Sequence, residues 1–280
     1  MFEFYTNKFK DFTVSSDRTV NEIIFEEHQT GNAVFPLERV LLNDIVILLE
    51  KAILNKLSSD IQFQKNYWTW GFVTVYYSNF YLAQLLNRLS NKFYIYINES
   101  LNKEVIYNNG IYEFGQNNRD NTHQREFKLL KSNYSTIKTY GDLRLKPIFD
   151  IFQITEKNEI FKYTIDNEIK ESEIRNRINY QLKHYKEIHL TNEEFENYKQ
   201  LFQEIISNTI SNEYPDYFQL LIINEKRFLF LSMLLNEIKA INPAFKIKIE
   251  RLFEKINEKY DETFHNVNLS TKALIGELLK

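Results

Sequence analysis

The sequence predicts a mainly α-helical protein: a helical bundle with a small β-hairpin insertion near residues 92–115. Its 280 residues include 6 Gly and 4 Pro against 23 Phe and 18 Tyr. Few residues therefore favour tight turns, and many large side chains can fill the spaces between helices. Two consecutive apolar segments, near 36–60 and 65–91, have the length and spacing of helices. Beyond residue 92 the apolar residues alternate instead, which is typical of strands.

The first long helix is predicted near 36–60. Pro36 suits a first helical position, because a backbone N–H is not needed there. Apolar side chains follow at helical spacing, namely Val40, Leu41, Ile45, Leu48, Leu49, Ile53 and Leu57. The preceding residues, 1–33, are expected to form an N-terminal arm with a short strand at 11–14.

The second helix, 65–91, is apolar almost all round its axis, so we expect it at the centre of the bundle with neighbours on several sides. Within it, residues 67–86 carry no charge and approach the length of a membrane span. Interspersed Thr, Ser, Asn and Gln residues, and a predominance of Tyr and Trp, favour a buried core helix instead. We therefore expect no contact with a membrane.

The chain after this helix is predicted to form a small sheet and then further helices. Strands are expected at 93–97 and 104–107, and Asn109-Gly110 before 111–114 is a strong hairpin turn signal. The polar residues 116–123 predict a loop. Further helical segments are predicted near 125–138, 145–153, 167–187, 192–209, 216–240, 244–260 and 270–280.

The organisation that these elements predict has three parts. The N-terminal arm, 1–33, precedes the helical bundle with its hairpin insert, 34–190. A C-terminal helical subdomain, 191–280, is expected to pack on that bundle.

Composition excludes several classes of function. The net charge of −3 provides no overall positive field, so any contact with nucleic acid has to be local. The chain has no Cys, which removes disulfides, thiolate metal sites and Cys nucleophiles and fits a reducing compartment. The N-terminus lacks the features of a signal peptide, so a cytoplasmic protein is expected. Gly-rich phosphate loops, the Gly-flanked serine turn and the zinc-binding His-Glu-x-x-His helix are absent, and no metal or cofactor is expected.

Two weaker patterns in the sequence are similar to metal sites. His184 and His189 are five residues apart, which places them about 140° apart around a helix and makes them poor joint ligands. Asp216 with Glu225-Lys226 is faintly similar to the carboxylate–lysine core of metal-dependent nucleases, but the spacing between the acid and the lysine differs. An aspartate at a helix N-terminus is the expected role of Asp216.

The strongest candidate for chemistry is the predicted helix around residues 173–184. Arg177 and His184 are seven residues apart, so they lie on one face within about 20° and about 10 Å along the axis. The apolar stripe of this helix consists of Ile174, Ile178, Leu182 and Tyr185. Five basic against two acidic residues give the helix a local charge of +3, from Lys170, Arg175, Arg177, Lys183 and Lys186 with Glu171 and Glu173. This is the local positive patch that RNA binding requires.

An arginine and a histidine on one face suit RNA cleavage without a metal. An imidazole with a pKa of about 6.5 exchanges protons at neutral pH, and a guanidinium holds the developing charge of a phosphate through paired hydrogen bonds. The RNA 2′-hydroxyl would be the nucleophile. The alternative is an amphipathic helix whose basic side chains are solvated or pair with the Glu-rich stretch 193–196.

Residues 75–86 and the Arg-Asn-Arg-Ile-Asn-Tyr-x-x-x-His pattern of 175–184 resemble the HEPN superfamily of helical-bundle domains, over about 36–190. The resemblance implies a metal-independent endoribonuclease or effector of a prokaryotic defence or toxin system. It also implies a homodimer that acts on RNA, with an antitoxin or effector protein as a further partner. Some HEPN-like domains serve as non-catalytic interaction modules, so this reading remains open.

The same resemblance assigns roles to residues of the candidate helix. Arg177 would bind phosphate and His184 would be the general acid or base. Asn176 and Tyr180 would orient the substrate or the imidazole. The basic character of the helix adds Arg175 and Lys183 to the substrate-binding residues. We expect residues 76–79 of the second helix to form the wall that faces this site.

Overall fold

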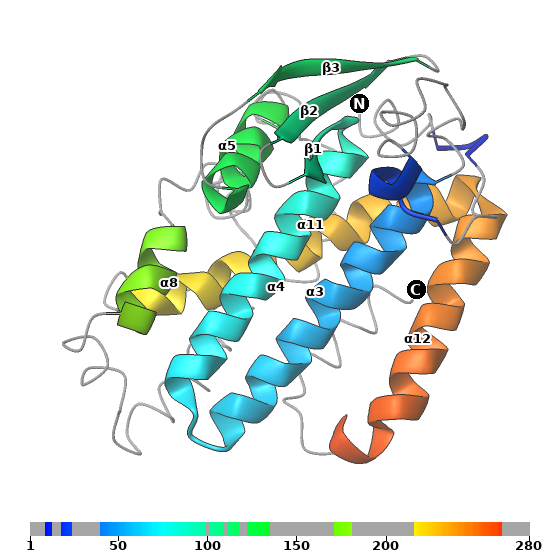
Figure 1. Cartoon of the computed structure of the whole chain (residues 1–280). Helices are drawn as coiled ribbons and strands as arrows, with labels where there is room; N and C mark the ends of the chain where they lie inside the picture. The colour runs from blue at the N-terminus through cyan, green and yellow to red at the C-terminus, as the bar shows by residue number, and fades with distance from the viewer. Residues whose placement is uncertain are drawn as a thin grey trace, which may run out of the picture.

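The architecture is a bundle of long helices with a three-stranded antiparallel sheet at one end (Figure 1). The computed structural model describes residues 9–12, 18–23, 40–98, 101–108, 111–117, 122–134, 171–180 and 216–264. The predicted fold class, a helical bundle with a small sheet after the second helix, is confirmed. The predicted helices at 145–153, 192–209 and 270–280 lie outside the described residues.

The two predicted apolar helices form an antiparallel hairpin. Helix α3 (Leu41–Gln64) and helix α4 (Trp68–Leu89) are joined by a tight turn in which Asn66 adopts φ 62°, a left-handed conformation that Asn tolerates better than most residues. Helix α3 continues four residues beyond its predicted end, because Phe63 extends the buried surface and packs against Trp68 of α4. Pro36 lies outside the described residues.

Helix α4 is the central helix, as predicted. It packs against α3, α5, α8 and α11. Its surface is buried on nearly all sides, apart from Thr69 and a stripe formed by Trp70, Thr74, Tyr77, Tyr81 and Gln84. Among the described residues, no helix combines the length and the apolar character needed to cross a membrane.

The sheet follows α4 directly and consists of β1 (Lys92–Asn98), β2 (Leu101–Asn108) and β3 (Ile111–Asn117) in sequence order. Asn108 pairs with Ile111, which confirms a hairpin around the predicted turn. Phe93, Ile95 and Val105 are buried, so this face of the sheet completes the core.

Helix α5 (Thr122–Tyr134) packs against α4 and β1. The loop predicted at 116–123 is wrong at both ends, because 116–117 continue β3 and the helix begins at Thr122. This early start brings His123 onto the helix, where it contacts side chains of α4.

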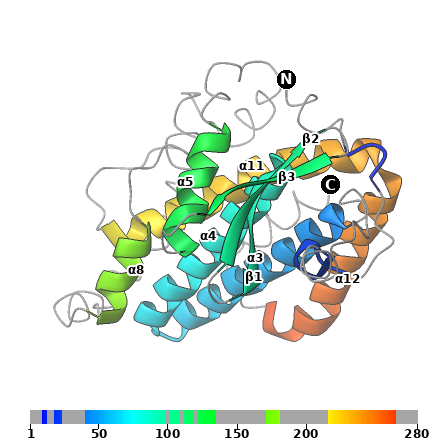
Figure 2. The same cartoon turned by 45° about the horizontal axis from the view of Figure 1, so that its top comes forward.

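The C-terminal helices complete the bundle. Helix α8 (Glu171–Tyr180) packs on α4, and a short 3-10 turn (Asp216–Phe218) leads into α11 (Gln219–Ile241). Helix α11 crosses behind α3 and α4 and ends at α12 (Pro243–Phe264), which packs against α3 (Figures 1 and 2).

Asn242 separates α11 from α12 and fastens the N-terminal segment. Its side-chain oxygen accepts a hydrogen bond from the Phe245 N–H at 2.9 Å, and its amide nitrogen donates to the carbonyls of Phe9 and Phe12, both at 2.8 Å. The predicted strand at 11–14 is wrong where the structure describes it, because Asp11 and Phe12 belong to a turn. Side-chain bonding by Asn242 provides the local anchor that strand pairing would otherwise give.

Candidate functional site

The predicted site helix is present as α8 over the part that the structure describes. Ile174 and Ile178 are buried, as the predicted apolar stripe requires. Arg177 is half-buried, Asn176 is exposed, and the Tyr180 side chain is 75% exposed. Lys183 and His184 lie outside the described residues, so the pairing of Arg177 with His184 stays a prediction.

The second arginine of this helix, Arg175, contacts the central helix. Its guanidinium carbon lies 5.1 Å from the centroid of the Tyr76 ring, so the cation packs on this ring. Ile174 and Ile178 share a buried cluster with Phe72 and Tyr76. The expected packing of this part of α4 against the candidate helix is therefore confirmed for residues 171–180.

Tyr76 connects Arg175 to a histidine on a third helix. The Tyr76 hydroxyl lies 2.7 Å from Nδ1 of His123. The imidazole centroid lies 4.2 Å from that of Phe80 and 5.6 Å from that of Tyr76. His123 is the one histidine among the described residues, and helices α4, α5 and α8 together form an Arg175–Tyr76–His123 chain.

The sequence pattern predicts His123 at the end of a loop and indicates no role for it. Its partner Tyr76 lies 47 positions earlier in the chain. A usable signal was present in the helical pattern, because Tyr76 and Phe80 are one turn apart and present two rings on one face of α4. No local pattern, however, indicates which side chain packs on such a pair.

The surroundings keep the imidazole neutral. Burial lowers the pKa of His123 below its usual value, and the positive charge of Arg175 lowers it further. Burial also raises the pKa of the Tyr76 phenol, with Arg175 opposing that shift. At neutral pH the chain therefore consists of a cation, a neutral hydroxyl and a neutral imidazole.

The Tyr76–His123 contact admits two tautomers of the imidazole. If the phenol O–H donates to Nδ1, the imidazole proton is on Nε2. If Nδ1–H donates to the phenol oxygen, the Nε2 lone pair is left to accept a proton. A general base requires the second arrangement.

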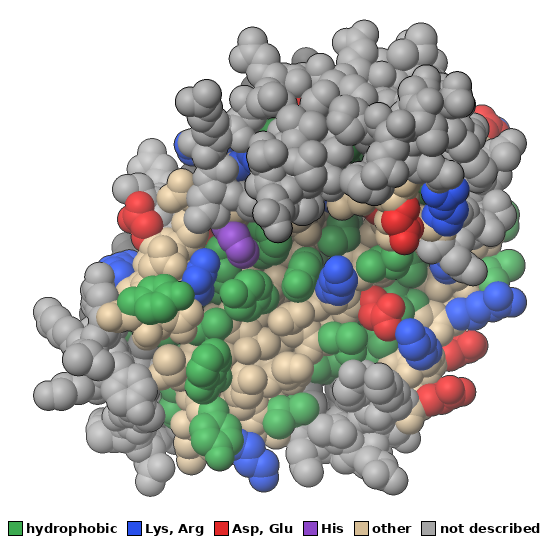
Figure 3. Space-filling model, in the orientation of Figure 1, with side chains coloured by type: hydrophobic (Ala, Val, Ile, Leu, Met, Phe, Trp, Pro, Cys, Tyr) green, Lys and Arg blue, Asp and Glu red, His purple; other side chains and the backbone are tan. Residues whose placement is uncertain are grey.

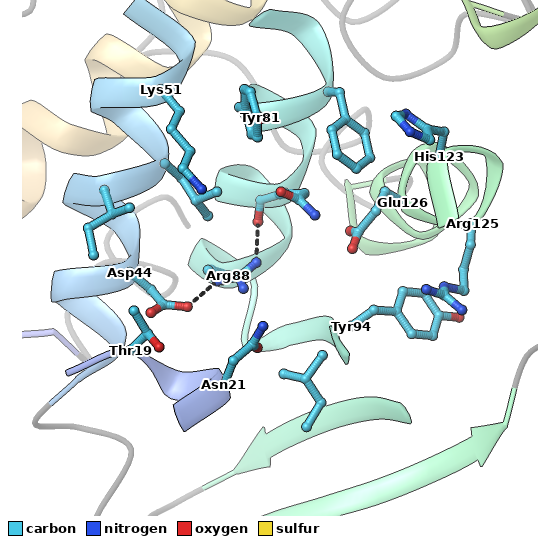
Figure 4. Close-up of a pocket in the computed structure, with 15 residues that line it drawn as sticks. Thr19, Asn21, Asp44, Lys51, Tyr81, Arg88, Tyr94, His123, Arg125 and Glu126 are labelled. Atoms are coloured by element: carbon cyan, nitrogen blue, oxygen red, sulfur yellow. Dashed lines mark hydrogen bonds and ion pairs between the residues drawn. The ribbon is translucent and has the colours of Figure 1, made fainter. Parts of the chain in front are cut away.

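His123 also lines a polar pocket of about 510 Å³ between α3, α4, α5 and the start of the sheet (Figure 4). Lys51 of α3 lies 5.5 Å from the Tyr81 ring centroid, and Arg125 of α5 lies 4.4 Å from that of Tyr94. The pocket thus has aromatic rings with cations beside them, which is a suitable lining for an anionic ligand with a planar ring.

Two carboxylates in the pocket wall are held by partners. Asp44 accepts a hydrogen bond from Nε of Arg88 at 2.7 Å. Glu126 accepts one from the Asn87 amide at 2.8 Å. Burial raises the pKa of Glu126, while Arg88 opposes that shift. The pocket therefore carries net positive charge from Lys51, Arg88 and Arg125 against these two acids.

The described part of the chain offers few side chains that could bind a metal ion together. No group of three or more His, Cys, Asp or Glu side chains is placed there as metal ligands would be. Glu225, one of the nuclease-like residues, is buried in an ion pair with Lys56 at 2.9 Å. Comparison of the chain with protein-family models, curated proteins and solved structures gives no match.

Proposed function

We propose that the protein is a metal-independent endoribonuclease of HEPN-like architecture, in a prokaryotic defence or toxin role. The observation that carries the proposal is the Arg175–Tyr76–His123 chain beside a positively lined pocket. For RNA transesterification, a neutral imidazole of fixed orientation can be the general base, and a guanidinium beside it can stabilise the charge on the phosphate.

In the proposed reaction His123 is the general base. It takes the proton of an RNA 2′-hydroxyl, and the 2′-oxygen attacks the adjacent phosphorus. The bond from phosphorus to the 5′-oxygen breaks, and that oxygen receives a proton from solvent. The products are a 2′,3′-cyclic phosphate and a 5′-hydroxyl. Arg175 would stabilise the charge that develops on the phosphoryl oxygens, and Tyr76 would position the imidazole.

The proposal assigns the remaining predicted residues to substrate binding or to a second catalytic pair. Arg177, Asn176 and Tyr180 reach solvent from the same helix as Arg175. Lys183 would extend this surface, and His184 with Arg177 remains the rival catalytic pair. The resemblance to HEPN domains also makes a homodimer, with RNA as the ligand, part of the proposal.

A non-catalytic interaction module is the second candidate, for example an antitoxin-like or effector-complex subunit. It is favoured by the high exposure of Tyr180 at the end of α8. An aromatic side chain in that position is typical of a protein contact.

Cleavage of a labelled RNA in EDTA tests the proposal. We expect the wild-type protein to yield 2′,3′-cyclic phosphate ends, and His123→Ala to reduce the rate by about 10²–10⁴-fold, the usual contribution of a general base. Lys131→Ala removes an exposed basic residue of the same helix α5 and should leave the rate unchanged.

The variants also separate the two catalytic pairs. If His184→Ala abolishes cleavage while His123→Ala retains it, the chemistry belongs to Arg177 and His184. If EDTA abolishes cleavage, the metal-independent mechanism is excluded. If the wild-type protein cleaves no RNA with or without EDTA, the ribonuclease is excluded and the interaction module takes its place.

A further inference from the structure

One face of α4 carries an aromatic stripe, in which Trp70 is exposed and the other members are half-buried. Its members are spaced four, three, four and three residues apart, which keeps them on one face of the helix: Trp70, Thr74, Tyr77, Tyr81 and Gln84. The Trp70 side chain is 63% exposed, although burying the large apolar surface of a tryptophan usually stabilises a protein. With a rise of 1.5 Å per residue, the three rings span about 16 Å along the helix.

The charged side chains beside the rings of this stripe are basic, whereas Asp44 and Glu126 line the pocket at its Gln84 end. Helix α4 contains no Asp or Glu. Lys51 lies beside the Tyr81 ring and Arg175 beside Tyr76. Figure 3 views the molecule from this side and shows hydrophobic and basic side chains near the histidine of α5. The surface is therefore complementary to an anionic ligand with flat apolar parts.

The stripe leads past the candidate base into the pocket. The Tyr77 ring centroid lies 6.1 Å from that of His123. Tyr81 and Gln84, one turn further along, line the pocket together with His123 and Lys51 (Figure 4). At about 510 Å³ the pocket falls within the size range of small-ligand sites, enough for one nucleotide unit.

We propose that the α4 stripe is a binding site for unpaired nucleobases, which stack on Trp70, Tyr77 and Tyr81 while the strand passes His123 and places one nucleotide in the pocket. Aromatic side chains with basic side chains nearby bind single strands in this way without strong sequence preference, since every base has a flat face. A duplex keeps its bases inside the helix and cannot use the stripe. The inference rests on the proposed function for its choice of RNA as the ligand.

The test uses a fluorescein-labelled, single-stranded 12-nucleotide RNA that is 2′-O-methylated and therefore cannot be cleaved. Fluorescence anisotropy should show binding of this strand and much weaker binding of its duplex. Trp70→Ala should weaken binding by about 5- to 100-fold, the usual effect of removing one stacking ring. Trp70→Phe retains a ring and should restore most of the affinity. Ile247→Ala, which shortens an exposed apolar side chain of α12, should have no effect.

Tryptophan fluorescence gives a second readout without any substitution. The protein contains two tryptophans, and the other one, Trp68, is buried. Iodide should therefore quench Trp70 selectively, and the bound strand should protect it.

Equal affinity of Trp70→Ala and wild type, equal binding of the duplex, or no binding of the strand overturns the inference. Because the probe cannot be cleaved, the outcomes separate the two proposals. Binding at the stripe without any RNA cleavage refutes the ribonuclease but not the stripe. Cleavage with no effect of Trp70→Ala on binding refutes the stripe but not the ribonuclease.

Discussion

The buried ion pair between Glu171 and Arg227 fastens the candidate helix to the bundle. The guanidinium contacts the carboxylate through both terminal nitrogens, at 2.6 and 3.0 Å, and both side chains are 3% exposed. Glu171 lies in the first turn of α8, one turn before Arg175. The pair therefore determines where Arg175 meets Tyr76.

Replacing one member by Met should leave an uncompensated charge in the core. Breaking a buried pair in this way typically costs about 3–5 kcal/mol. For 280 residues, with an unfolding entropy of about 2.1 cal/mol/K per residue, this corresponds to a fall in Tm of about 5–9 °C. Replacing both members, Glu171→Met with Arg227→Met, should cost less than either single change, because no charge remains buried.

The two single variants should differ in their pH dependence. After Glu171→Met, Arg227 cannot lose its charge at any accessible pH. After Arg227→Met, Glu171 can become neutral by binding a proton, since burial already raises its pKa. A carboxyl whose pKa is raised in the folded state stabilises that state below its unfolded pKa, and this contribution is lost as pH rises through the folded pKa. The deficit of Arg227→Met should therefore be smaller at pH 5 than at pH 8, whereas that of Glu171→Met should be no smaller at pH 5, because only the wild type retains the proton-binding carboxyl.

Urea denaturation followed by far-UV circular dichroism measures these free energies. Glu50→Gln is the matched control, because Glu50 pairs with Lys255 at 2.8 Å on the surface and such pairs contribute at most about 1 kcal/mol. If Glu171→Met and Glu50→Gln cost the same, or if the double variant loses the sum of its singles, the reasoning from burial is refuted.

Two further predictions concern His123 and the α3–α4 turn. NMR titration should give His123 a pKa below 6.5, and Arg175→Met should raise it. Because this pKa is lowered on folding, stability should fall as pH drops through about 6.5, and His123→Gln should remove that part of the fall. Gly71→Ala should cost about 1–3 kcal/mol in thermal unfolding, because a Cβ there would lie under 3.0 Å from the Phe63 ring. Adding Phe63→Leu should recover part of this loss, and no recovery would contradict the clash.

The central position of helix α4 was predictable because its own sequence is apolar almost all round the helix axis. A helix that is apolar on all sides needs neighbours on all sides, and α4 has four. The hairpin after it was predictable for a similar reason, since Asn-Gly between alternating residues specifies both the turn and the strands. In both segments the local pattern and the tertiary environment demand the same structure.

The middle of α11 shows where such patterns fail. Residues 224–227, Asn-Glu-Lys-Arg, read as a polar segment, yet all four side chains are buried. Asn224 donates to Ser78 and Asn79, at 2.9 and 2.8 Å. Glu225 pairs with Lys56 of α3, and Arg227 pairs with Glu171 of α8. Hydrophobic periodicity cannot report partners that lie 56 or more positions away in the chain.

Like these buried pairs, the candidate site depends on contacts between helices that are far apart in the sequence. Arg175 was predicted as a substrate-binding residue from the basic character of its helix, but its contact with Tyr76 depends on how α8 docks. That docking is fixed by Glu171, a residue that the local charge count treats only as an acid reducing the positive patch. A buried carboxylate thus holds a guanidinium one turn later in place, and this guanidinium in turn lowers the pKa of His123. The buried charge of Glu171 is costly for folding, yet through Arg175 it helps to set the pKa of the His123 imidazole.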